Sequence, residues 1–459
     1  MQLTDNFNRP KHKMAIVYFV LVELLIFVAS YYENVQLYTL FMVGFTLLSI
    51  FIDPILPICI NICSSPVALE MNAMITVAIN VIAVAVAFFE HTLILKRGRI
   101  AIQDFLFILG AALGILLSIV FGQNAAVHTG LLQLILLLWY IVSTRIYVRK
   151  NNYLLLVAFI LAGVFMLVNI LIQMATDSTT LLWGYRLSYN GSVRTLSSAL
   201  AVPIYYLCIK LLLPQKKPIS FALRILIFLA LVVMSYVLIL TYSRGVMISL
   251  LIAIFYLLIS QIKKMTYGRM GFYILFLGVS TYLLMQMEID SELMLSGLSS
   301  GSGRIDIWRF FFERIKTRGF VGYLVGFGPG DINRITFGTI MSGAYAHSTL
   351  FDYIFSYGII GAFILGYLIV RSFVIARKSQ DPRIMGLLIL TIALYSTHGN
   401  SANYAFHLLL GLVYSLSAEQ IQSKRANNEL TESQKVYTIR KGCYEKTGND
   451  CGVDAVEDL

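Results

Sequence analysis

Residues 219–261 read ISFALRILIFLALVVMSYVLILTYSRGVMISLLIAIFYLLISQ, and this stretch decides the fold. It consists of two apolar runs, 219–241 and 245–261, on either side of the short segment TYSRG. Arg224 and Arg244 are its only charged residues. A helix that crosses a bilayer needs about 20 mostly apolar residues. The stretch therefore predicts two membrane-spanning helices with Arg244 between them.

The same pattern recurs along the chain. Of its 459 residues, 58% are hydrophobic and only 13% are charged, whereas about a quarter are charged in soluble domains. This composition excludes a soluble enzyme, a disordered chain and a secreted disulfide scaffold. Further apolar runs lie at 14–31, 36–52, 71–94, 100–121, 125–144, 153–175, 195–213, 271–287, 349–371, 384–398 and 404–418. We expect an all-α polytopic membrane protein with about 12–14 transmembrane helices.

The proline-containing stretch 52–70 complicates the helix count. It contains Pro54, Pro57 and Pro66 and is only half apolar. It is either a re-entrant or broken segment, or one of the predicted runs does not span. An odd number of spans would place the basic N-terminus outside, and the charge bias favours an even number.

The net charge of +11 is a topology signal. Basic residues come in short groups between the apolar runs, as the positive-inside rule predicts for cytoplasmic loops. Both chain ends are then cytoplasmic, and loops 176–194, 242–245, 288–348 and 399–403 are outside. A nucleic-acid partner is not expected. The lipid bilayer is the partner that the composition implies.

Four regions follow from this map. They are transmembrane helices over 1–287, a large outer loop over 288–348 with an amphipathic helix, transmembrane helices over 349–423, and a polar cytoplasmic tail over 424–459 that we expect to be disordered.

The outer loop holds the most distinctive sequence. The segment IDIWRFFFERI places Ile305, Trp308, Phe312 and Ile315 on one face of a helix, which suits a position along the membrane surface. The Gly/Pro turn GFGPGD follows. No cluster of metal-ligating side chains is apparent, so no metal and no cofactor are expected.

Arginines on the outer side need a reason, because the positive-inside bias disfavours them. Arg186, Arg194, Arg244 and Arg304 all lie there, and arginine pairs bidentately with phosphate or carboxylate. Snorkelling or a local ion pair is the alternative reading, and we prefer it for Arg194, Arg309, Arg314 and Arg318. The charges within apolar runs, Glu23, Glu90, Asp104 and Arg224, favour snorkelling or helix pairing.

His347 ends the outer loop immediately before a predicted span. Its side chain can accept a proton near neutral pH, which suits a general base, although a lone histidine is more often structural. His398 and His407 flank another outer loop and could line the same cavity.

Four segments in order resemble the O-antigen ligase and O-antigen polymerase superfamily. They are YRLSYNGSVRTLSSAL at 185–200, TYSRGVMISLL at 241–251, SGRIDIW at 302–308 and HSTLFDYIFSYGIIG at 347–361. The last fits a His-[Asn/Ser/Gln]-x9-Gly-x-x-[Gly/Thr/Tyr] pattern through His347, Ser348, Gly358 and Gly361. Ser348 stands where asparagine is common.

The resemblance implies a metal-independent, inverting glycosyltransferase whose donor is a glycan on undecaprenyl pyrophosphate. Arg186, Arg244 and Arg304 would bind the pyrophosphate, and His347 would be the catalytic base. Asp306, Trp308 and Tyr345 are candidate sugar contacts. The enzyme would lie in the bacterial inner membrane with its site on the periplasmic side.

Polymerase and ligase share this donor and differ in the acceptor. By resemblance the GFGPGD turn favours a polymerase of O-antigen, capsule or exopolysaccharide, with a chain-length regulator as a candidate partner. A ligase that transfers the glycan to lipid A–core is the alternative. A flippase for lipid-linked sugars is an alternative of another class, and it predicts symmetric halves and charges at the membrane midplane.

Overall fold

The computed structural model describes part of the chain. The described residues are 10–32, 34–50, 52, 56–64, 82, 102–122, 126–145, 152–175, 182–183, 186–187, 193–213, 220–261, 271, 278, 304–329, 348–397 and 405–425. Tyr345, His347 and all but a few residues of the predicted runs 71–94 and 271–287 and of the 424–459 tail lie outside them.

The described elements are almost entirely helical. The first half contains α2 (Pro10–Tyr31), α3 (Val35–Ile50), α4 (Leu56–Ser64), α6 (Ile102–Phe121), α7 (Val127–Arg145), α8 (Asn152–Ala175) and α9 (Val193–Leu212). The second half contains α10 (Phe221–Leu240), α11 (Arg244–Gln261), α14 (Arg304–Thr317), α15 (Gly319–Val325), α17 (Thr349–Ser379), α18 (Pro382–Ser396) and a last helix over 405–425. One antiparallel pair of two-residue strands, β1 (Leu182–Trp183) and β2 (Arg186–Leu187), is the exception.

These helices confirm the all-α polytopic membrane class. Within the described residues, five helices are long and apolar enough to cross a membrane: α6, α10, α11, α17 and residues Leu154–Ala175 of α8. Shorter apolar helices coincide with five further predicted runs, 14–31, 36–52, 125–144, 195–213 and 384–398. The outer surface of α10 suits contact with lipid rather than water, because the side chains of Leu226 and Leu229 are more than half exposed on this apolar helix.

The end of α17 differs from the end of the run predicted for it. The run 349–371 continues as helix to Ser379, because hydropathy falls where the charges begin while helical hydrogen bonding continues. In the 52–70 stretch the structure describes α4 over Leu56–Ser64. The residues on either side of it lie outside the described part of the chain, so the re-entrant or broken segment stays a prediction.

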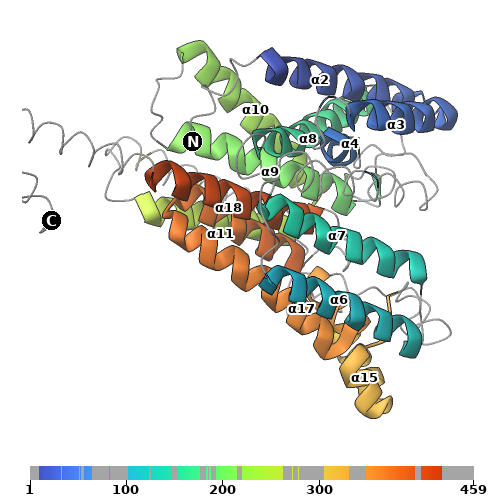
Figure 1. Cartoon of the computed structure of the whole chain (residues 1–459). Helices are drawn as coiled ribbons and strands as arrows, with labels where there is room; N and C mark the ends of the chain where they lie inside the picture. The colour runs from blue at the N-terminus through green and yellow to red at the C-terminus, as the bar shows by residue number, and fades with distance from the viewer. Residues whose placement is uncertain are drawn as a thin grey trace, which may run out of the picture.

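The helices form a continuous chain of contacts (Figure 1). Helices α2, α3 and α4 pack together and against α8, which packs on α9. The pair α11 and α18 joins α9 to α17, and α17 contacts α6 and α15. Figure 1 shows α15 at the end of α17, at the far side of the molecule from α2 and α3.

Small residues allow close contact between these helices. Gly163 of α8 faces Pro203 of α9, and a Cβ on Gly163 would lie 2.4 Å from the proline ring. Such contacts are typical of membrane interfaces, where van der Waals packing replaces the hydrophobic effect.

Candidate functional site

Aromatic side chains dock the amphipathic helix α14 onto the start of α17. The rings of Trp308 and Phe351 stack with centroids 4.0 Å apart, and those of Phe311 and Phe355 lie 4.9 Å apart. Both pairs advance along the two helices in the same direction, so α14 and α17 run parallel. Such pairs contribute about 0.5–1.5 kcal/mol each beyond the burial of area.

The buried face of α14 differs from the predicted one. Phe311 and Ile315 are its buried side chains, whereas Ile305 is 45% and Phe312 is 42% exposed. Phe312 nevertheless meets α17, because its ring lies 5.1 Å from that of Phe355 and 6.2 Å from that of Phe351. The predicted amphipathic helix is therefore present with Trp308, Phe312 and Ile315 toward α17, and Ile305 is the predicted member that stays exposed.

Arg304 lies where two helices begin. It is the first residue of α14, one turn before Trp308, and Ser348 caps α17 one turn before Phe351. Since the helices are parallel, Arg304 and Ser348 lie at the same end of the pair. Helix N-termini carry a positive potential and bind anions. Sequence places His347 directly before Ser348.

The guanidinium of Arg304 is half-buried and makes no hydrogen bond or ion pair with any described residue. Burial lowers its pKa, yet an arginine of this kind stays charged at neutral pH. A cation at a helix N-terminus is unfavourable by itself. An anion bound between Arg304 and the helix ends would remove that repulsion.

Arg244 repeats this arrangement. It is the first residue of α11, it is half-buried, and across the described part of the chain its side chain has no hydrogen-bonding or ionic partner. A tight turn leads to it from α10, with Tyr242 at φ +49° and the Thr241 hydroxyl accepting the Ser243 N–H at 3.3 Å. Arg244 is therefore also a cation at the positive end of a helix.

The other predicted site residues are placed less completely. Arg186 lies on β2, opposite Trp183, and β2 contacts α10. Asp306 is exposed and 3.7 Å from Arg309, and the ring of Trp308 is half-buried against Phe351. Their roles, and those of Tyr345 and His347, stay predictions.

A break in α17 lies beside this region. Gly358 has φ +59° inside the helix, and the carbonyls of Phe355 and Ser356 accept the N–H groups of Phe327 and Gly328 at 2.8 and 2.9 Å. The glycines permit this approach, since a Cβ on Gly358 would lie 2.4 Å from the Tyr323 carbonyl oxygen. The GFGP part of the predicted turn is thus hydrogen-bonded into α17.

Arg318 holds the same segment from the other side. Its Nη1 donates to the carbonyl of Gly326, and its Nη2 donates to the Phe121 carbonyl, the last of α6, at 2.6 Å. The Ala126 N–H, just before α7, donates to the Pro329 carbonyl at 2.9 Å. A structural role for Arg318 agrees with these bonds, although they go to backbone carbonyls and not to the local ion pair that the sequence suggested. The sequence gives no sign that they reach α6, nearly 200 residues away.

A buried polar cluster also lies close to the start of α17. Gln133 Nε2 donates to Tyr353 Oη, Tyr353 Oη hydrogen-bonds His407 Nε2, and Gln133 Nε2 lies 3.2 Å from His407 Nε2. All three side chains are fully buried. Only His407 was singled out from the sequence, and the polar Gln133 within an apolar run was the available signal for the cluster.

The described residues contain no group of three or more His, Cys, Asp or Glu side chains that could hold a metal ion. The candidate site residues that the structure places include two cations, Arg244 and Arg304, and the carboxylate of Asp306, and Asp352 lies in the first turn of α17. The chemistry of the two arginines is that of anion binding.

The apolar helices and the long α17 define a multi-pass membrane protein. The family model described as O-antigen ligase matches residues 229–366, which extend from α10 through α11, α14 and α15 into α17. The predicted resemblance to the O-antigen ligase and polymerase superfamily is thereby confirmed, and the match supports a function of this type. It includes Arg244, Arg304 and His347 and excludes Arg186. No curated protein sequence matches the chain.

Proposed function

We propose that this protein is a membrane glycosyltransferase that joins undecaprenyl-pyrophosphate-linked repeat units into O-antigen, capsule or exopolysaccharide chains. One observation carries the proposal. Arg244 and Arg304 lie within the family match and are the first residues of α11 and α14. Both side chains are half-buried cations with no ionic partner among the described residues. Each of the two is a suitable partner for a phosphate oxygen of a pyrophosphate.

The proposed reaction needs a base and charge stabilisation. The acceptor hydroxyl oxygen attacks the anomeric carbon from the face opposite the pyrophosphate, and its proton passes to His347. The bond between the anomeric carbon and the pyrophosphate oxygen breaks, and undecaprenyl pyrophosphate leaves with the bonding electrons. Arg304, Arg244 and Arg186 stabilise the charge that develops on this leaving group, without a metal ion.

The membrane supplies the donor in this proposal. The site faces the periplasm at the outer leaflet of the bacterial inner membrane, where the lipid tail of the donor stays in the bilayer. Asp306, Trp308 and Tyr345 contact sugar, and a chain-length regulator is a candidate protein partner.

A ligase is the second candidate, because the matching family is described as O-antigen ligase and the match alone does not separate the two activities. The glycan profile of a deletion strain separates the two. Lipid A–core that bears a single repeat unit is the expected profile of a lost polymerase. Bare core, with long glycan still on the lipid carrier, would mean a ligase, and an unchanged profile would overturn both.

Variants then test the site. We expect His347→Ala and Arg304→Gln to fail to restore long glycan, with activity lowered about a hundredfold, because each removes a group that acts in the transition state. Arg309→Gln is the matched control, since it makes the same change in the same helix at a side chain that is 72% exposed. Equal activity of the two arginine variants, at equal membrane levels, would contradict the role of Arg304.

A further inference from the structure

The short helix α15 turns an apolar face outward. Its sequence GFVGYLV contains no charged residue, and the side chains of Phe320, Val321 and Tyr323 are 78, 42 and 46% exposed. Gly322 and Val325 form the opposite, buried face. A single exposed apolar side chain is common on a protein surface, but three on one turn and a half of helix make a patch that calls for an apolar environment.

Helix α6 gives the level of α15 relative to the membrane. The 20 residues of α6 measure about 30 Å, the thickness of a hydrocarbon core. Its first residue follows the basic group 96–99, and its last residue, Phe121, therefore lies at the opposite boundary. Arg318 Nη2 donates to the Phe121 carbonyl at 2.6 Å, and α15 begins at the next residue. The start of α15 is thus held at a membrane boundary.

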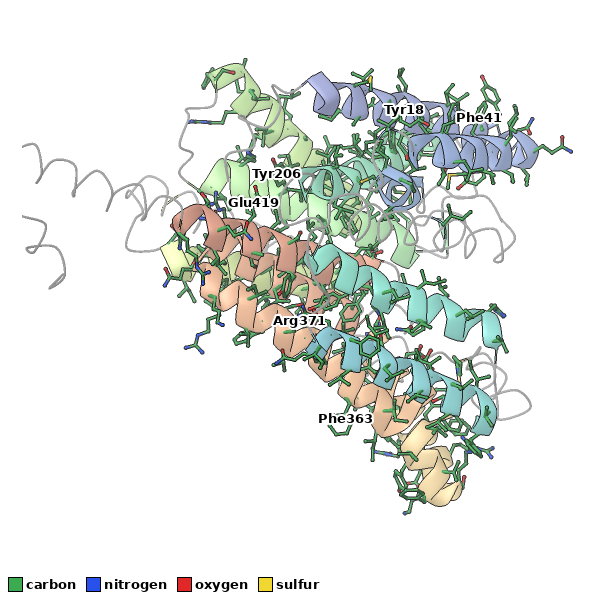
Figure 2. The ribbon with its side chains drawn as sticks, in the orientation of Figure 1. Tyr18, Phe41, Tyr206, Phe363, Arg371 and Glu419 are labelled. Atoms are coloured by element: carbon green, nitrogen blue, oxygen red, sulfur yellow. The ribbon has the colours of Figure 1, made fainter. Side chains whose placement is uncertain are left out.

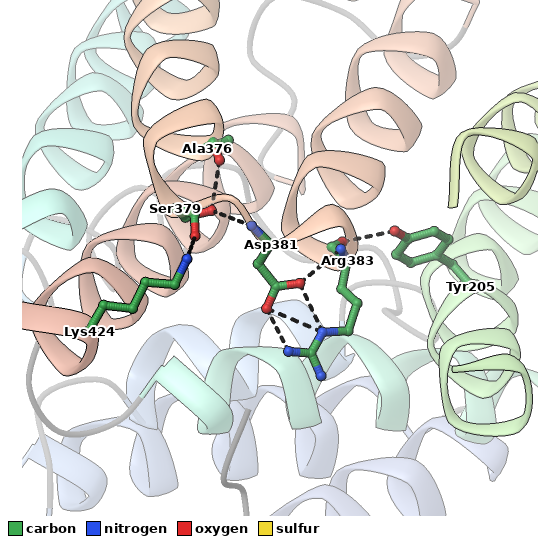
Figure 3. Close-up of polar contacts among 6 residues, drawn as sticks. All are labelled: Tyr205, Ala376, Ser379, Asp381, Arg383 and Lys424. Atoms are coloured by element: carbon green, nitrogen blue, oxygen red, sulfur yellow. Dashed lines mark hydrogen bonds and ion pairs between the residues drawn. The ribbon is translucent and has the colours of Figure 1, made fainter. Parts of the chain in front are cut away.

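The two ends of α17 differ in the same sense. Its last turn is basic, and beyond it Lys424 donates to the Ser379 carbonyl at 2.9 Å and Arg383 pairs with Asp381 at 2.6 Å (Figure 3). Basic groups of this kind are typical of the cytoplasmic side. Helix α15 contacts α17 far from that end, at the break at Gly358 (Figure 1). On the topology expected from the charges, α15 belongs to the outer leaflet.

The neighbouring spans continue the apolar surface of α15. Val120 and Phe121 at the end of α6, and Ile359 and Phe363 just after the break in α17, are all at least half exposed. Both helices are long and apolar enough to cross a membrane, so their exposed side chains suit contact with lipid. Since α15 packs against both helices, its exposed face adjoins a surface of the same character.

Positive charge lies directly beside this apolar face. Residues 313–318 carry three basic side chains and one acidic side chain. Arg314 and Lys316 are exposed in the last turn of α14, which ends just before α15. Cations next to an inserted apolar face suit the phosphate groups at the headgroup level of a bilayer.

We propose that α15 is an interfacial anchor whose Phe320, Val321 and Tyr323 side chains enter the outer leaflet where headgroups meet acyl chains. Tyrosine is enriched at this depth. A glycan is the other occupant that an aromatic face could take, but ligand sites add several placed polar groups, and the tyrosine hydroxyl is the one polar side-chain group of α15. The anchor also fixes the end of α14 at the membrane surface. The proposal rests on the membrane class and not on the glycosyltransferase activity.

Tryptophan fluorescence of the full chain in lipid nanodiscs tests the anchor. Phe320→Trp adds one indole to the three tryptophans of the chain, and the wild-type signal is subtracted. We expect lipids brominated near the headgroup end of the acyl chain to quench the added emission more than lipids brominated near the bilayer centre, because interfacial helices insert by about 5–10 Å. Aqueous iodide should quench it weakly. Tyr323→Trp repeats the measurement from the same face.

Two matched variants calibrate the quenching. Phe363→Trp, at an exposed position near the middle of α17, should respond more to the deeper bromines. Arg309→Trp, on the exposed polar side of α14, should respond to iodide and not to brominated lipid.

The remaining outcomes would overturn the anchor. Iodide quenching of Phe320→Trp as strong as that of Arg309→Trp, without an effect of bromine, would place α15 in water. If added O-polysaccharide then protected the indole from iodide, the face would bind glycan. Protection from both quenchers in nanodiscs would mean that protein covers the face.

Discussion

Gln133, Tyr353 and His407 belong to α7, α17 and the helix over 405–425, which are far apart in the sequence. Each side chain is fully buried, and hydrogen bonds join the three. A polar group in a membrane bundle costs free energy unless it is paired, so the cluster selects one arrangement of these helices. Tyr353 lies little more than one turn from Ser348, and the cluster therefore fixes the helix that His347 precedes.

Removing the Tyr353 hydroxyl tests this function of the cluster. We expect Tyr353→Phe to lower the free energy of unfolding by about 1 kcal/mol, because the hydrogen bonds of the hydroxyl with Gln133 and His407 are lost. Thermal unfolding in detergent measures the change. Tyr236→Phe is the control, since Tyr236 is 56% exposed on α10. Equal melting of the two variants would contradict the function.

At the scale of elements, the break in α17 and the 326–329 segment depend on each other. Gly326 and Gly358 both have positive φ, and a Cβ on either would collide with the backbone around the other. The carbonyls of Phe355 and Ser356 accept hydrogen bonds from the N–H groups of Phe327 and Gly328. The break in α17 therefore does not leave these two buried acceptors unpaired. Two glycines distant in sequence thus make one junction.

Substitution of Gly358 should disturb this junction. We expect Gly358→Ala to destabilise the protein by at least about 1–2 kcal/mol, from the left-handed backbone alone, and to lower glycan assembly. Gly366→Ala is the matched control in the same helix, where a Cβ meets no atom within 4 Å. It should be neutral or stabilising by about 0.5–1 kcal/mol. Similar melting temperatures for both would contradict the close contact.

Arg318 offers a second test at this scale. Arg318→Ala removes the bonds to the carbonyls of Gly326 and Phe121, so we expect about tenfold faster cleavage of the 319–329 segment in native protein, the effect of about 1–2 kcal/mol less resistance to local opening. Chymotrypsin suits the assay because the substitution removes none of its cleavage sites. Arg314→Ala, at an exposed arginine over the Phe310 ring, should cleave like the wild type. Equal acceleration in both variants would count against the contact.

At the scale of the whole molecule, one ion pair inside the bundle joins four elements. Asp104 of α6 lies 2.5 Å from Arg371 of α17, and both are mostly buried. The guanidinium lies 4.9 to 5.8 Å from the rings of Tyr140, Tyr367 and Tyr414, on α7, α17 and the helix over 405–425. Figure 2 shows Arg371 among these helices, while Phe363 of the same helix points away from them. Helix pairing, one of the two readings favoured for Asp104 from sequence, is what the structure shows.

A double-mutant cycle tests this pair. Asp104→Asn and Arg371→Gln should each cost about 3–5 kcal/mol, because each leaves an uncompensated buried charge. The double variant should cost clearly less than the sum of the two, since it buries no charge. Unfolding of all four proteins in mixed micelles gives the coupling free energy. Additive losses would show that the two charges do not interact.

The sequence by itself determined the membrane class, the position of most helices and the resemblance that the family match confirms. It could do so because a bilayer acts on each segment separately: about 20 apolar residues favour insertion whatever their neighbours are. The amphipathic character of α14 is equally local. Its buried face is not, because the rings of α17 bury Phe311, which lies outside the predicted stripe, while Ile305 stays exposed.

Only the tertiary structure decided how these helices meet. The bonds of Arg318 to α6, the cluster around Tyr353 and the contact of Gly326 with Gly358 join residues that no periodicity relates. The same is true of the parallel docking that brings Arg304 to the end of α17 where Ser348 lies. These contacts depend on side-chain shape and on hydrogen-bond direction across neighbouring helices. The hydropathy of a single helix carries no information on either.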